Sequence, residues 1–143
     1  MERLHAILIK DFITKDPIVA ELGDTVADAY EKMHTHQIRH LPVVDREGNL
    51  MGIFSQTDLN RAYTPHEMET GWYYDKEGMA LLNLEHFMTK DPAALTPENT
   101  LKEAAEMMGN QRFGCLPIVV AGTRKLVGII SYVDILREIA KLF

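Results

Sequence analysis

The sequence predicts an α/β (α+β) fold made of two copies of one strand–helix–strand–strand–helix unit. Three observations predict it: an internal repeat, helix-starting motifs that recur in both copies, and short β-branched segments between them. With 143 residues, 46% of them apolar, the chain is long enough to bury a core without disulfides.

The repeat begins with residues 12–17, Phe-Ile-Thr-Lys-Asp-Pro, which recur as Phe-Met-Thr-Lys-Asp-Pro at residues 87–92. The same offset of 75 relates Leu41-Pro42 to Leu116-Pro117. The second copy then gains one residue in a turn, and the offset becomes 76 for Gly52/Gly128, Ser55/Ser131 and Asp58/Asp134. A run of matches with a single gap in a turn indicates a duplicated unit.

The first helix of each copy is predicted by a capping box, Thr25-x-x-Asp28 in one and Thr100-x-x-Glu103 in the other. Apolar residues follow at helical spacing, from Val26 to Met33 in the first copy. Two short apolar segments joined by a turn then predict a β-hairpin. The expected strands are residues 41–44 and 50–54, then 116–120 and 126–130, and the last helices cover about 57–63 and 133–142.

These boundaries place one unit at residues 1–63, a linker at 64–86 and the second unit at 87–143. Each copy alone has too small a core to be stable, so we expect the two to pair within one chain. The linker holds the aromatic residues Trp72, Tyr73 and Tyr74, for which packing or an interface is favoured over ligand contact.

Composition excludes several classes of function. Fifteen Lys and Arg against 21 Asp and Glu give a net charge of −6, with no basic cluster, so duplex nucleic acid and anionic membranes are not expected partners. The chain has no apolar segment long enough to span a bilayer and nothing that resembles a signal peptide. We therefore expect a cytoplasmic protein.

No residue pattern points to catalysis or to a metal. His34 and His36 lie on different faces of the predicted helix, so a metal site with His40 is not expected. The single Cys115 excludes an internal disulfide and has no base or cation beside it in the sequence. No phosphate-binding glycine loop or nucleophile motif is present, and we expect no enzyme activity.

Two segments of each copy carry a specific resemblance. Residues 39–45 (Arg-His-Leu-Pro-Val-Val-Asp) and 52–58 (Gly-Ile-Phe-Ser-Gln-Thr-Asp) resemble a CBS motif, the cystathionine-β-synthase domain. Residues 87–140 resemble a second one, with Cys-Leu-Pro-Ile at 115–118 and Gly-Ile-Ile-Ser-Tyr-Val-Asp at 128–134. The chain thus resembles a stand-alone CBS pair, or Bateman module, and is similar to small bacterial acetoin-utilisation-type proteins.

The resemblance implies two βαββα motifs packed about a pseudo-twofold axis. It also implies two clefts that bind AMP, ADP, ATP, S-adenosylmethionine or another adenosine-containing ligand, and a homodimer of pairs. No required cofactor is implied. Since no effector domain is recognised, we expect the signal to pass to a separate, unknown effector protein.

The Ser-x-x-Asp pattern has a physical rationale as a nucleotide contact. It lies at a strand-to-helix turn, where backbone N–H groups favour a phosphate. An ionised Asp can accept hydrogen bonds from both ribose hydroxyls. The same pattern is also a capping box that needs no ligand, and this alternative stays open.

By analogy with the family, each cleft combines residues of both copies. The first predicted site contains Thr14, Ile18, Val19, Ile38, Arg39, His40, Ser131 and Asp134. The second predicted site contains Thr89, Ala93, Ala94, Phe113, Gly114, Cys115, Ser55, Thr57 and Asp58. Pro42 and Pro117 complete the set of ligand-binding residues implied by the resemblance.

The two predicted sites differ in charge. Arg39 and His40 belong to the first, so a phosphorylated adenosine ligand is expected to prefer it. The second has the complete Ser-x-Thr-Asp set but an apolar floor. The alternative function is a ligand-independent scaffold that dimerises or docks a partner, and Phe113 is the bulky residue that would then block an adenine position.

Overall fold

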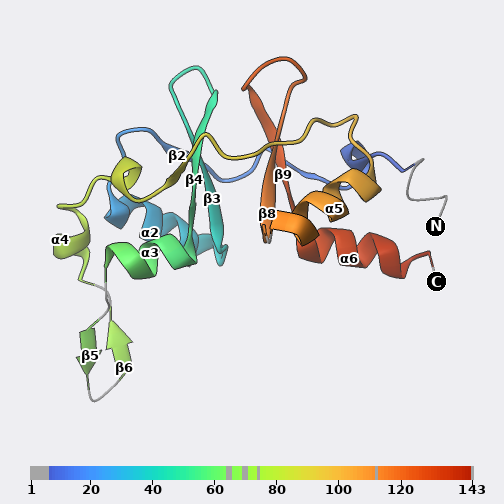
Figure 1. Ribbon diagram of the computed structural model, residues 1–143. Coiled ribbons are helices and arrows are strands. Elements are labelled where there is room, and N and C mark those ends of the chain that lie inside the picture. The colour runs from blue at the N-terminus through green and yellow to red at the C-terminus, as the bar shows by residue number, and fades with distance from the viewer. Residues whose placement is uncertain (1–6, 64–65, 69–70, 74, 112, 143) are drawn as a thin grey trace. The chain divides into compact units, whose positions relative to one another are not determined.

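A computed structural model describes residues 7–63, 66–68, 71–73, 75–111 and 113–142 (Figure 1). The chain divides into two compact units. One, the central unit, runs from Ile18 to Pro92. The other, the terminal unit, joins the chain up to Pro17 with the chain from Ala93 onward.

The sheet of the central unit has four strands in the order β2-β3-β4-β7. The β3–β4 hairpin is its centre, because these antiparallel strands are the longest of the four. The first strand pairs with β3 in parallel, and the last pairs with β4 antiparallel. Their bounds are Ala20–Glu21 for β2, His40–Val44 for β3, Leu50–Ser55 for β4 and Thr89–Lys90 for β7.

The helices α2 (Val26–His36) and α3 (Gln56–Ala62) lie on one side of the β3–β4 hairpin (Figure 1). The predicted capping box starts α2, since Thr25 Oγ1 accepts the Asp28 amide and Asp28 accepts the Thr25 amide. The core also takes apolar residues from the segment that follows α3. Here α4 (Lys76–Met79) and the 3-10 turn η2 (Leu84–His86) bury Met79 and Leu84 completely.

The terminal unit repeats this plan with three strands in the order β1-β9-β8. Its core is formed by α5, α6 and these strands, together with Ile9 from the 3-10 turn η1. The capping box predicted at Thr100 and Glu103 is present, with backbone bonds of 2.9 and 3.1 Å. The bounds are Ile9–Asp11 for η1, Thr14–Lys15 for β1, Leu101–Gln111 for α5, Cys115–Val119 for β8, Leu126–Ser131 for β9 and Tyr132–Ala140 for α6.

Each Thr-Lys strand pairs with the hairpin of the other sequence copy. Thr14 of β1 lies opposite Ile129 of β9, and Thr89 of β7 lies opposite Ile53 of β4. The approach is close: a Cβ on Gly128 would lie 2.7 Å from the Thr14 carbonyl oxygen, and one on Gly52 would lie 2.8 Å from that of Thr89. Each compact unit therefore combines the hairpin of one sequence copy with the Thr-Lys strand of the other.

The linker contains a short antiparallel pair, β5 (His66–Met68) with β6 (Gly71–Tyr73). The predicted packing role of the aromatic side chains at positions 72–74 lies outside the described part of the chain. The α/β fold class with two repeated motifs is confirmed, and so is the order of elements within each motif.

Candidate functional site

The Ser55–Asp58 motif of the central unit lies where β4 passes into α3. Ser55 Oγ accepts the Asp58 amide at 3.2 Å, and Asp58 Oδ2 accepts both the Ser55 amide at 2.8 Å and its hydroxyl at 3.0 Å. Asp58 is only 3% exposed. The predicted capping box is therefore present, and it already occupies one oxygen of the carboxylate.

The second oxygen of Asp58 is also engaged. Arg61, one turn further along α3, donates to Asp58 Oδ1 at 2.8 Å. Its side chain is 72% exposed, so the ion pair lies at the surface with its acidic partner buried below it. A ribose hydroxyl that approached Asp58 would have to compete with this guanidinium.

His40 lies beside this motif, because it is the register partner of Ser55 across the β3–β4 hairpin. Burial is the largest influence on its imidazole and lowers its pKa below the ordinary value of 6.5. The charge of Arg39 lowers the pKa further, whereas the carboxylate of Asp58 opposes both. His40 is thus held toward its neutral form, and Arg39 is the exposed cation of the pair.

The terminal unit contains the same motif with a different outcome. Asp134 Oδ2 accepts the Ser131 amide at 2.9 Å and its hydroxyl at 3.0 Å, and Ser131 Oγ accepts the Asp134 amide at 3.3 Å. Within the described residues, no cation pairs with Asp134, although Arg137 occupies the position that Arg61 has in the first copy. Both of the hydrogen bonds that the Asp134 carboxylate accepts are on Oδ2, and its Oδ1 oxygen accepts none from the described residues.

Thr14 shares the terminal unit with Ser131 and Asp134. It is exposed on β1, opposite Ile129, which precedes Ser131 by two residues on β9. Thr89 has the matching place in the central unit, opposite Ile53 and two residues before Ser55. Each predicted threonine thus lies on a strand beside the one that leads into the Ser-x-x-Asp motif assigned to the same site.

Cys115 takes the place that His40 has in the first copy, opposite Ser131 in the β8–β9 hairpin. Its thiol is buried, and burial together with the charge of Asp134 raises the pKa to about 12. A thiol with this pKa stays protonated at neutral pH. This agrees with the sequence-based interpretation of Cys115 as a small strand residue rather than a nucleophile.

The remaining predicted residues are divided between the two units. The central unit contains Thr57, exposed in the first turn of α3, and Pro42, buried in β3, together with Ile18, Val19, Ile38 and Arg39. The terminal unit contains Pro117, buried in β8, together with Ala93, Ala94, Phe113 and Gly114. Both predicted sites draw on both units, so their assembly stays a prediction.

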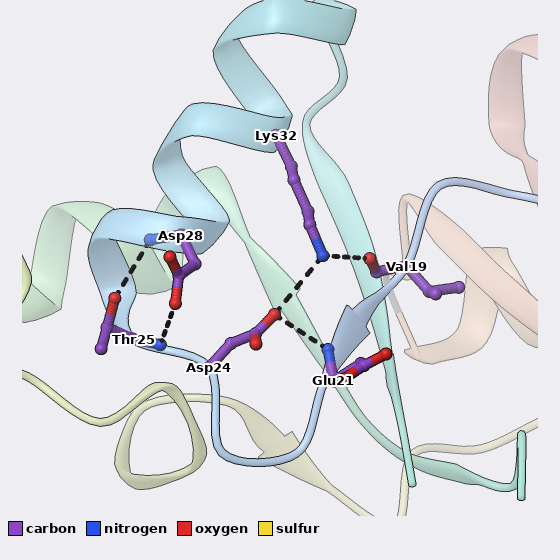
Figure 2. Close-up of polar contacts among 6 residues, drawn as sticks. All are labelled: Val19, Glu21, Asp24, Thr25, Asp28 and Lys32. Carbon is purple, nitrogen blue, oxygen red and sulfur yellow. Dashed lines mark hydrogen bonds and ion pairs between the residues drawn. The ribbon is translucent and has the colours of Figure 1, made fainter. Parts of the chain in front are cut away.

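Sequence reasoning did not identify a polar network around the segment that contains Val19. Lys32 of α2 reaches the Val19 carbonyl oxygen at 2.8 Å and the Asp24 carboxylate at 3.4 Å (Figure 2). One difference between the copies could have indicated it: the second copy has Met107 where the first has Lys32. The close approach at Gly52 and Gly128 was also missed, although both glycines belong to the repeated motif.

An apolar groove of about 310 Å³ lies between α5 and α6 of the terminal unit. Small residues form part of it, whereas Tyr132 and Leu136 beside them are 55% and 57% exposed. Its lining residues are Ala105, Met108, Gly109, Phe113, Tyr132, Ile135, Leu136 and Ile139. Phe113 thus lines a helix–helix groove in this unit.

Two other features of the described residues bear on function. No group of three or more His, Cys, Asp or Glu side chains among them is arranged to hold a metal ion. No helix in the described ranges has the length and apolar character needed to cross a bilayer.

Comparison with known proteins identifies the family. The CBS domain matches this chain twice, at residues 9–64 and 84–141, so the chain belongs to the CBS domain family and carries two copies of the domain. The protein MJ1225 of Methanocaldococcus jannaschii is 34% identical over 137 residues. This match covers 93% of the chain, but the chain spans only about half (47%) of that relative.

Two solved structures match nearly the whole chain. A Vibrio cholerae protein described as an acetoin utilization protein (AcuB) is 32% identical with a TM-score of 0.76, over 95% of this chain and 92% of the other. The CBS domain pair of MJ0100 is 26% identical with a TM-score of 0.77, over 95% and 98%. The MJ0100 pair was crystallised in complex with 5′-methylthioadenosine and S-adenosyl-L-methionine. The expected resemblance to a CBS pair is confirmed, and so is the expected similarity to acetoin-utilisation-type CBS proteins.

Proposed function

We propose that this chain is a regulatory module that binds an adenosine-containing ligand and passes the signal to a separate partner protein. It is not itself an enzyme. The observation that carries the proposal is the Ser131–Asp134 motif, in which one carboxylate oxygen caps α6 and the other accepts no hydrogen bond from the described residues. The ligand classes are AMP, ADP, ATP and S-adenosylmethionine.

The arrangement suits the chemistry of a nucleoside. An ionised carboxylate with an open oxygen accepts a charge-assisted hydrogen bond from a ribose hydroxyl. The start of α6, a helix of nine residues, provides backbone N–H groups and a dipole that favour an anionic group. The 26% identical CBS pair of MJ0100 binds two adenosine derivatives, and this also supports the proposal.

The first and second predicted sites are unequal under this proposal. The first combines the open carboxylate of Asp134 with Arg39, whereas the second relies on Asp58, which Arg61 already engages. We expect a phosphorylated ligand to prefer the first site for both reasons. A ligand shifts the conformational balance only by its difference in affinity for the two states, so this site would carry most of the signal.

A thermal-shift panel with AMP, ADP, ATP, S-adenosylmethionine, 5′-methylthioadenosine and 2′-deoxy-AMP tests the proposal. A ligand at one hundred times its Kd adds about 2.7 kcal/mol to the unfolding free energy. For a chain of this size the melting temperature should rise by roughly 10 °C. We expect at least one ribonucleoside to stabilise the protein and 2′-deoxy-AMP to be much weaker than AMP. Protein that is shown to be free of nucleotide and gives a flat panel would contradict the proposal.

The groove between α5 and α6 favours a second candidate function, a scaffold that dimerises without a ligand. Tyr132 and Leu136 project from the same face as the small residues Ala105 and Gly109. A face that carries both protrusions and recesses can pair with its own copy about a twofold axis. The occupant we propose for the groove is therefore a second copy of this chain.

Replacing the two protruding residues by their first-copy equivalents tests this homodimer. The double variant Tyr132→Gln, Leu136→Asn carries the residues found at Gln56 and Asn60. We expect the wild type to be a dimer by light scattering and the variant to be a monomer that melts at a similar temperature. A wild-type monomer would contradict the dimer, and a stable dimer with a flat ligand panel would favour the scaffold over the sensor.

A further inference from the structure

Lys32 forms an unusual link between a helix and the strand that follows Val19. Its ammonium nitrogen lies 2.8 Å from the Val19 carbonyl oxygen and 3.4 Å from Oδ2 of Asp24. Figure 2 shows the side chain extending from α2 toward both oxygens. The side chains of Lys32 and Asp24 are 37% and 23% exposed, so water screens these charges only in part.

The same carboxylate holds the next part of the strand. Asp24 Oδ2 accepts the Glu21 amide at 3.0 Å, so the backbone is fixed on both sides of the buried Ala20 (Figure 2). Ala20 pairs in parallel with Val43 of β3. We call this set, Lys32 and Asp24 with the backbone of Val19 and Glu21, the Lys32 clamp. Hydrogen bonds to ionised groups are stronger than those between neutral groups, so the clamp opposes movement of residues 19–21.

The second sequence copy keeps the side-chain bond to the strand amide but not the lysine. Asn99 stands at the position of Asp24, and its Oδ1 accepts the Thr96 amide at 2.7 Å, as Asp24 does for Glu21. Met107 stands at the position of Lys32 and has no donor for the carbonyl of Ala94, the equivalent of Val19. The ammonium link is therefore a feature of the first copy. Because the second copy has the same fold without it, the fold does not require this link.

We propose that Lys32 is a positioning residue for ligand binding at the first predicted site. This inference rests on the proposed function. Ile18, which is 37% exposed, and the half-buried Val19 provide the apolar surface on which the base is expected to lie. The clamp fixes that surface before the ligand arrives, so binding does not have to order it. The ammonium acts through the Val19 backbone and not through contact with the ligand.

The test compares Lys32→Met, which installs the second-copy residue, with the wild type by calorimetric titration. Two probes separate positioning from charge: AMP carries a phosphate, whereas 5′-methylthioadenosine carries none. We expect Kd at the tighter site to rise by about five- to tenfold for both probes, as the cost of ordering the segment returns. Lys76→Met is the matched control. It removes an exposed ammonium of α4 that pairs with Glu31 of α2, the helix that carries Lys32. It should leave both Kd values within about twofold of the wild type.

A second variant and a second measurement keep the inference falsifiable. Asp24→Asn copies Asn99, so it can keep the bond to the Glu21 amide while losing the ion pair with Lys32. This variant should bind both probes more weakly than the wild type does. In the ligand-free protein, both variants should show faster amide exchange at Glu21 and Leu22, whose amides bond to Asp24 and Val44.

The outcomes are distinguishable. A loss of AMP affinity with unchanged 5′-methylthioadenosine affinity would show that Lys32 acts by its charge on the phosphate and would overturn the positioning role. Unchanged affinity for both probes would overturn it while leaving the proposed function intact. A wild type that binds neither these probes nor any other ligand of the thermal-shift panel would contradict the proposed function, and the positioning role would fall with it.

Discussion

The Arg61 guanidinium lies 2.8 Å from Oδ1 of Asp58, one turn earlier on α3, whereas Arg137 makes no such contact with Asp134 on α6 among the described residues. The two Ser-x-x-Asp motifs have the same capping bonds to within about 0.1 Å. They differ in how much of the carboxylate is left for a ligand. This asymmetry within a duplicated fold is the basis of the first prediction.

Replacing Asp134 by Ala should reduce AMP affinity more than replacing Asp58 by Ala. Each variant loses a capping box, with a cost of about 1 kcal/mol in unfolding free energy, so their stabilities serve as matched controls. The Asp134→Ala variant also loses the open acceptor for a ribose hydroxyl, so we expect its AMP affinity to drop by about tenfold or more. Equal losses in calorimetric titration of the two variants would contradict this prediction.

The Arg61→Gln variant should make the two motifs more alike. It frees Oδ1 of Asp58 at the cost of a largely exposed ion pair, so the loss of stability should be at most about 1 kcal/mol. We expect binding of an adenosine ligand at the second predicted site to become stronger while the first site is unaffected. Calorimetry on Arg61→Gln in the Asp134→Ala background isolates the second site, and no gain there would show that Arg61 does not restrict it.

Gly52 and Gly128 are required for the pairing of the two Thr-Lys strands. In Gly128→Ala the new Cβ would lie 2.7 Å from the Thr14 carbonyl oxygen, and backbone cannot yield as a flexible side chain does. Unfolding free energy should fall by roughly 1–3 kcal/mol in denaturant titration, and Gly52→Ala should behave alike. Gly109→Ala in the Tyr132→Gln, Leu136→Asn background is the control, because no second copy is expected in the groove there, nothing lies within 4 Å of its Cβ in α5, and it should be stabilising by up to about 1 kcal/mol. A neutral Gly128→Ala would mean that the strand is not held this closely.

The protein should lose stability in mildly acidic solution through His40. Because the pKa of His40 is lowered when folded, the unfolded chain binds more protons between the folded pKa and 6.5. The unfolding free energy should therefore decrease as pH falls through 6.5 toward the folded pKa. Denaturation of the wild type and His40→Gln across this range measures the difference, with His36→Gln as an exposed control. The prediction fails if the wild type and His40→Gln have the same pH dependence.

Proton titration of the His40 ring by NMR checks the cause. Arg39→Gln should raise the pKa of His40, since the Arg39 charge lowers it, and Asp58→Asn should lower the pKa further. An unchanged pKa of His40 in both variants would show that burial alone governs the imidazole.

Cys115 should be inert in the folded protein. A pKa of about 12 leaves almost no thiolate at pH 8, and the side chain is only 7% exposed. Ellman's reagent should label Cys115 only when denaturant unfolds the chain. Rapid labelling of the folded protein would contradict both the burial and the raised pKa.

The sequence predicts local features well where one residue pattern determines one structure. The Thr25 and Thr100 capping boxes, the helical stripes and the β3–β4 and β8–β9 hairpins all lie within one or two residues of their expected positions. A strand before the first helix of each copy was predicted, but the positions of the two-residue strands β1, β2 and β7 were not, because they are too short to show a period of two. Their positions depend on long-range pairing, and so does the reach of Lys32 to Val19.

In the candidate site, too, the local residue patterns could be predicted and the side-chain contacts could not. The Ser-x-x-Asp motifs were visible as repeated residues, and the structure confirms their capping bonds. The difference between Arg61 and Arg137 was not visible, because both stand three residues after the aspartate and only side-chain rotamers separate them. Each predicted site takes residues from both sequence copies, and ligand binding there stays a prediction.

The pairing of Thr14 with Ile129 also has a consequence for the order in which the newly made chain can fold. Residues 18–92 are contiguous and can form their sheet soon after they leave the ribosome. The segment before Pro17 is made earlier than these residues, yet its partner strand β9 is made more than one hundred residues after it. Until then the apolar side chains of Ile9 and Ile13 have no core to enter, so this segment stays exposed to aggregation and to molecular chaperones while residues 18–92 can already be folded.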